Sequence, residues 1–121
     1  MKRHCVLILS LALLWFTSAY AQNPEVHILS DADWNVPRTN ESILKMPALV
    51  QTMRDYDEHP DAKIQIRYPG GDEGTLWANE VRSWLVALGV ASRHIELLPG
   101  SRKDGQLELQ VMPPMTAQTL N

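Results

Sequence analysis

The stretch that decides the fold runs from Ile64 to Pro99 and reads IQIRY-PGGDEG-TLWANEVRSWLVALGV-ASR-HIELLP. Its first part alternates the apolar residues Ile64 and Ile66 with polar neighbours, which is typical of a strand with one buried face. A glycine-rich segment follows, then apolar residues at helical spacing, then a second short apolar run. The stretch therefore predicts a β-α-β unit, and the rest of the chain is interpreted as layers added to it.

The helix of this unit has a wide apolar face. Its apolar residues are spaced i, i+4, i+7, i+8 and i+11, at Trp77, Val81, Trp84, Leu85 and Leu88. Gly89 is expected to follow the helix in a left-handed conformation. At the other end, Asp72 is the predicted N-cap with Thr75 three residues on, and Gly74 is the alternative cap.

Two further elements are predicted before the unit. Residues 26–29 (VHIL) favour a first strand, and the segment 34–40 (WNVPRTN) favours a loop in which Trp34 covers the edge of the core. A helix is predicted from residue 46 to residue 58, because its apolar residues recur at i, i+3, i+4 and i+7. Pro47 suits its first turn, where a missing N–H has no intrahelical partner to lose.

One further strand is predicted after the β-α-β unit, and it is the fourth strand of the expected sheet. Leu107, Leu109 and Val111 alternate with polar residues, and Asp104-Gly105 before them is a hairpin signal that would pair this strand with residues 94–98. The expected fold is α+β: a β-α-β-α-β-β two-layer sandwich, in which a four-stranded mixed sheet carries two helices on one face.

The first 21 residues have the pattern of a secretory signal peptide. Lys2 and Arg3 precede the apolar run 6–16, and small residues stand at Ala19 and Ala21. An uncleaved anchor is the alternative, but the run is shorter than the roughly 20 residues that a membrane span needs. We expect a signal peptide at 1–21, a single domain at 22–112 and a flexible tail at 113–121.

Composition limits the cell compartments and the classes of partner that we expect for this protein. The only cysteine, Cys5, leaves with the signal peptide, and the loss of Lys2 and Arg3 lowers the formal charge from −3 to about −5. An acidic domain without a basic cluster is not expected to bind nucleic acid. No later apolar run is long enough to span a membrane. An exported small domain without disulfides is expected in the periplasm.

The sequence gives little reason to expect an enzyme. It has no G-x-S-x-G motif, and His27, His59 and His94 fall on separate predicted elements without metal-ligand spacing. We therefore expect no catalytic residues, no metal and no cofactor. The remaining enzymatic alternative is a small hydrolase in which His94 and Glu96 form a proton-transferring pair on one strand face.

The glycine loop admits two sharper interpretations, and both are disfavoured. RYPGGDE at 67–73 is similar to the signature of the GGDEF diguanylate cyclases, but that family carries it in a hairpin and here it precedes a helix. A strand, a glycine loop and a helix N-terminus can also bind phosphate. Asp72 and Glu73 would repel the anion, and no lysine closes the loop as in a P-loop.

The order of elements resembles the OmpA C-terminal-like domain, a periplasmic module that binds peptidoglycan. The helix of that family shows the pattern Arg-Ala-x-x-Val-x-x-aromatic-Leu-x-x-x-Gly-Val, and residues 77–90 here read WANEVRSWLVALGV. The resemblance covers most of the mature chain as an order of elements and about 30 residues as a motif. It implies the fold described above.

The same resemblance predicts the position of a candidate site, and the residues at that position differ from those of the family. In the family, an aspartate after the second strand and an arginine opening the helix hold diaminopimelate; here Trp77 takes the arginine position and Asp72 stands in for the aspartate. We expect Trp77 to fill the place of the ligand carboxylate. The candidate ligand-binding residues are Arg67, Tyr68, Asp72, Glu73 and Trp77. The expected function is non-enzymatic docking to an envelope protein through the open sheet face or the acidic loop, with peptidoglycan binding through Tyr68–Thr75 as the alternative.

Overall fold

The computed structural model describes residues 24–114, so the predicted signal peptide and residues 115–121 of the predicted tail lie outside the described residues. The strands are β1 (Val26–Ser30), β2 (Lys63–Tyr68), β3 (Ile95–Pro99) and β4 (Gln106–Met112). The helices are α1 (Asp31–Trp34), α2 (Asn40–Lys45), α3 (Pro47–Glu58) and α4 (Asp72–Ala87), and the 3-10 turn η1 (Ser92–His94) precedes β3. The predicted α+β class is confirmed.

The four strands form one mixed sheet in the order β1-β4-β2-β3. β2 and β3 are parallel, as the β-α-β unit requires, and β4 is antiparallel to both β1 and β2. The predicted hairpin between β3 and β4 is wrong, because β2 lies between them. The turn signal at Asp104-Gly105 is local, whereas the place of β4 is decided by burial of its apolar side chains between β1 and β2.

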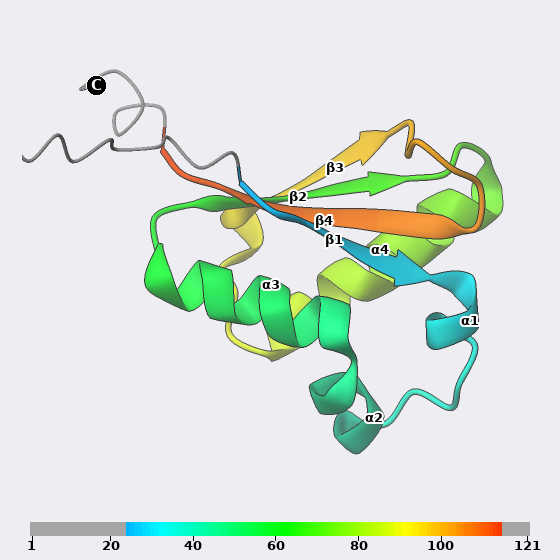
Figure 1. Cartoon of the computed structure of the whole chain (residues 1–121), viewed down its shortest axis with the longest axis horizontal. Coiled ribbons are helices and arrows are strands. Elements are labelled where there is room, and N and C mark those ends of the chain that lie inside the picture. The colour runs from blue at the N-terminus through cyan, green and yellow to red at the C-terminus, as the bar shows by residue number, and fades with distance from the viewer. Residues whose placement is uncertain (1–23, 115–121) are drawn as a thin grey trace, which may run out of the picture.

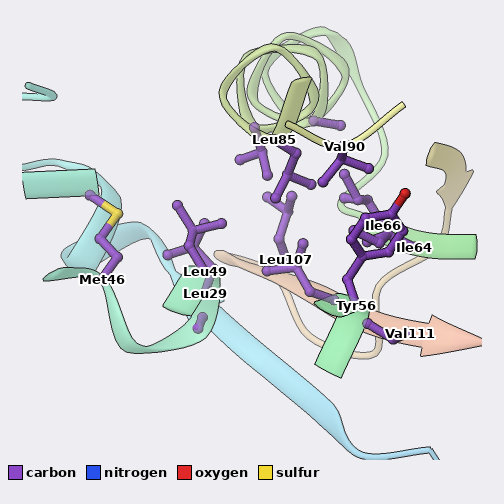
Figure 2. Close-up of a cluster of buried hydrophobic side chains, with 14 of the residues drawn as sticks. Leu29, Met46, Leu49, Tyr56, Ile64, Ile66, Leu85, Val90, Leu107 and Val111 are labelled. Carbon is purple, nitrogen blue, oxygen red and sulfur yellow. The ribbon is translucent and has the colours of Figure 1, made fainter. Parts of the chain in front are cut away.

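The two long helices cover the same face of the sheet (Figure 1). α3 packs on β1 and β4, and α4 packs on β2 and β3. Between these layers lies one apolar core, part of which Figure 2 shows, and each sheet strand supplies it with alternate residues. Ile64, Ile66, Leu107 and Leu109 are completely buried. The polar side chains between them therefore lie on the opposite face of the sheet, which no described helix covers.

Helix α3 is hydrogen-bonded to both edges of the sheet through two consecutive residues. Asp55 Oδ2 lies 2.7 Å from Nε2 of the buried His27 on β1. The hydroxyl of Tyr56 lies 2.6 Å from Nδ1 of His94, just before β3. His94 is thus engaged with Tyr56, and Glu96 instead lies 3.4 Å from the amide nitrogen of Gln65. The proton-transferring pair that the sequence suggested is not formed.

The segment between β1 and α3 is more helical than predicted. Residues 34–40 were expected as a loop, but Trp34 ends the four-residue helix α1, whose first turn is capped by the Ser30 hydroxyl accepting from the backbone N–H of Asp33. Thr39 and Ser42 form a reciprocal capping box that begins α2. The prediction that Trp34 covers the core edge is confirmed, because only 6% of it is exposed. Within residues 24–114, no helix is long and apolar enough to cross a bilayer.

Candidate functional site

A pocket of about 410 Å³ opens where three connections meet at one end of the sheet. Figure 1 shows α1, the loop from β2 to α4 and the loop from β3 to β4 at this end. We call it the acidic pocket. Its lining residues are Asp31, Trp34, Asn35, Pro69, Gly70, Glu73, Gly74, Trp77, Asp104 and Gly105.

The glycine loop forms one wall of the acidic pocket, and two of its glycines have different structural roles. Gly71 has φ +92° and is the N-cap of α4, a conformation that residues with a side chain rarely adopt. Gly74 lies in the first turn of the helix, where an added Cβ would stand 1.8 Å from the carbonyl oxygen of Pro69. The helix therefore begins in direct contact with the loop backbone. The predicted cap at Asp72 is wrong, because the backbone turns into the helix one residue earlier.

Two tryptophans form the aromatic part of the lining. The ring centroids of Trp34 and Trp77 are 6.4 Å apart and the ring planes are tilted by 33°, within the range of favourable aromatic pairs. The guanidinium of Arg38 lies 4.8 Å from the Trp34 ring centroid and forms an ion pair of 3.3 Å with Glu80. Arg38 thus holds Trp34 in place, while Glu80 offsets its positive charge.

The polar part of the lining is negatively charged. Asp31, Glu73 and Asp104 each carry a carboxylate, and within residues 24–114 no basic side chain lines this pocket. The backbone N–H of Asp31 donates to the carbonyl of Gly105 at 2.9 Å, which joins α1 to the loop before β4. Three carboxylates beside two indole rings favour a cation, because ring faces and carboxylates both attract positive charge.

One donor in this pocket is unusual. The indole nitrogen of Trp77 is buried, and among the described residues it finds no hydrogen-bond acceptor. A buried donor left in this state costs about 1–3 kcal/mol. Trp77 also lines the acidic pocket, which is open beside it.

The predicted site residues separate into three groups. Glu73 and Trp77 both line the acidic pocket. Tyr68 contributes its carbonyl, which accepts hydrogen bonds from the backbone of residues 100 and 101 at 2.9 and 3.1 Å. Asp72 is exposed and is not among the lining residues, and Arg67 lines a different pocket on the open face of the sheet.

Sequence reasoning missed Asp31, Trp34 and Asp104 as members of one site. They lie far from the glycine loop in the sequence, and only the sheet order brings them to it. A signal was nevertheless present, since Asp31 follows the first predicted strand and Asp104 precedes the last. Acidic residues at strand ends on one edge of a sheet are candidates for a shared site.

The described residues form no metal centre, in the acidic pocket or elsewhere. Within residues 24–114, no group of three or more His, Cys, Asp or Glu side chains is arranged to hold an ion. The chain matches no protein-family model, no curated protein and no solved structure.

Proposed function

We propose that this protein is an exported, non-enzymatic interaction module with an OmpA C-terminal-like fold, and that its acidic pocket holds a cationic group of an envelope protein. The observation that carries this proposal is the lining itself: three acidic residues, two tryptophans and no basic residue line a pocket of about 410 Å³. The parallel β2-α4-β3 unit and the mixed four-stranded sheet support the fold.

The charge of the pocket decides the class of group it receives. A ligand carboxylate would meet three acidic and no basic side chains among the lining residues, whereas an ammonium or guanidinium group would pair with Asp31, Glu73 or Asp104. Contact with an indole face adds about 0.5–2 kcal/mol, depending on how completely the cation is desolvated. The substitution of tryptophan for the arginine of the resembling family thus favours cation binding over binding of a carboxylate.

Titration of the mature protein with N-acetyl-lysine amide, followed by tryptophan fluorescence, tests the pocket. We expect saturable binding that is at least tenfold weaker for the neutral analogue N-acetyl-norleucine amide. Glu73→Gln combined with Asp104→Asn should weaken binding of the lysine compound about tenfold. The matched control is Glu58→Gln, at the exposed end of α3, which should leave binding unchanged. Equal binding of the charged and neutral compounds would contradict the proposal.

Peptidoglycan is the second candidate, because its peptide stem also carries an ammonium group and the loop Tyr68–Thr75 forms part of the pocket wall. A photo-crosslinking residue at Leu76, which is 64% exposed on α4 near the pocket, separates the two. Adducts of defined protein mass that resist lysozyme support an envelope protein. Adducts that lysozyme digests support peptidoglycan, and co-sedimentation with purified sacculi should then depend on Glu73.

A further inference from the structure

A second pocket lies on the face of the sheet that no described helix covers. It has a volume of about 330 Å³ and we call it the arginine pocket. Its lining residues are Val26, Gln65, Arg67, Gly100, Arg102, Glu108 and Gln110. Strand register explains their proximity, because Arg67 pairs with Glu108 across β2 and β4, and Gln65 pairs with Gln110.

Glu108 is the unexpected member of this pocket. Its side chain is only 3% exposed, although it belongs to the face opposite the helices. A buried carboxylate is costly unless a cation or hydrogen-bond donors compensate it. Arg102 does so, with its Nε 2.6 Å from Glu108 Oε1. The Arg102 side chain is itself 71% exposed, so its remaining N–H groups face solvent.

The backbone holds Arg102 in this position. The loop between β3 and β4 is fixed to the end of β2 by two hydrogen bonds, from the N–H groups of Gly100 and Ser101 to the carbonyl of Tyr68. Arg102 follows directly and reaches over the sheet to Glu108. The ion pair therefore joins a fixed loop to a central strand, and one edge of the Arg102 guanidinium stays available to a ligand.

Arg67 supplies a second guanidinium. It is exposed, and within residues 24–114 no carboxylate forms an ion pair with it. The neighbouring amide nitrogens are already engaged, since Gln110 donates to the carbonyl of Pro24 and Gln65 donates to Glu96. Two guanidinium groups and one carboxylate leave the arginine pocket with one excess positive charge in a domain that is otherwise acidic.

We propose that the arginine pocket binds a carboxylate group of a peptide, held between Arg67 and Arg102, with Glu108 as the positioning residue for Arg102. A planar carboxylate matches the paired N–H groups of a guanidinium. A single excess positive charge suits a monoanion, whereas a phosphate dianion would be repelled by Glu108. This site is separate from the acidic pocket and has the opposite preference for charge.

NMR titration of the mature protein with N-acetyl-alanyl-alanine tests the site. We expect saturable shifts of the backbone amides of residues 65–67 and 108–110, with binding at least tenfold weaker for the same peptide carrying a C-terminal amide. Inorganic phosphate at pH 7 should also bind at least tenfold more weakly. Equal binding of the acid and the amide, or binding of phosphate as tight as that of the acid, would overturn the proposal.

Variants at the two arginines complete the test. Arg67→Gln should weaken binding of the free acid about tenfold with the fold intact, because this side chain is exposed. Lys63→Gln is the matched control, since Lys63 lies on the same strand and face but does not line the pocket. Arg102→Gln should weaken binding to a similar extent. Unchanged affinity in Arg67→Gln, or an equal loss in Lys63→Gln, would assign the shifts to another place.

Discussion

The acidic pocket and the arginine pocket are both lined by residues of the loop between β3 and β4, and they are built in different ways. The acidic pocket is formed by backbone in close contact, with Gly74 against Pro69 and Asp31 bonded to Gly105. The arginine pocket is formed by long side chains that meet above a flat sheet face, and one ion pair positions them. The difference teaches that backbone substitutions should reshape the first pocket and spare the second, whereas loss of the Arg102–Glu108 ion pair should reshape the second and spare the first.

The largest effect is expected from Gly74→Ala. The new Cβ would stand 1.8 Å from the Pro69 carbonyl oxygen, so the start of α4 must move away from the loop. We expect a loss of about 3 kcal/mol in the free energy of unfolding, measured by urea denaturation. Gly70→Ala is the control, because its Cβ would meet nothing within 4 Å and should change stability by less than about 0.5 kcal/mol. Similar losses in both variants would mean that the close contact does not shape the pocket.

A smaller loss is expected from Arg102→Ala. This change leaves the Glu108 carboxylate buried without its cation and should destabilise the protein by about 2 kcal/mol. Adding Glu108→Gln should recover most of that loss, because the buried group is then neutral. Thermal unfolding of the two variants and of Lys103→Ala, an exposed neighbour, would measure this coupling. A double variant as unstable as the single one would show that the ion pair does not support the arginine pocket.

Trp77→Phe should change stability in the opposite direction. Phenylalanine keeps much of the aromatic contact with Trp34 and removes the indole N–H that has no acceptor. We expect a gain of up to about 1 kcal/mol in urea denaturation, offset in part by the smaller ring. The control is Trp84→Phe on the same helix. It also removes an indole, but the nitrogen of Trp84 is not a buried donor without an acceptor. A clear loss in Trp77→Phe alone would assign the indole nitrogen a partner.

The smallest effect is expected from Arg67→Gln. Its side chain is exposed and unpaired within the described residues, so the free energy of unfolding should change by less than about 0.5 kcal/mol. Differential scanning calorimetry of this variant beside Lys63→Gln would check the prediction. A loss well above that of Lys63→Gln would mean that Arg67 supports the fold, and the arginine pocket would then be a structural rather than a binding feature.

The sequence predicted the elements of this fold better than their arrangement. Alternating Ile64 and Ile66, and the apolar face around Val81 and Leu85, are local signals, and each gives a strand or a helix where expected. Which strands pair with β4 depends on where its apolar side chains are best buried in the core, and the alternative pairings compete. That competition is not local, which is why the turn at Asp104-Gly105 suggested a hairpin that does not form.

The two pockets differ in the same way. Glu73 was predicted as a site residue from the conspicuous glycine loop, and Trp77 from its place at the arginine position of the resembling family; both line the acidic pocket. Glu108 was placed on an ordinary polar strand face, and no feature of the sequence marks it as buried. Its burial depends on its pairing with Arg67 and on Arg102, and both follow from the strand order. A site made by strand register is therefore harder to predict than one made by a loop.

Arg102 and Asp104 stand two residues apart on one loop, and each lines a different pocket. A polypeptide that crossed this loop would meet positive charge on one side and negative charge on the other. Reversing the polypeptide would bring like charges together at both positions. A polypeptide partner that spanned both proposed sites would therefore be accepted in one direction only.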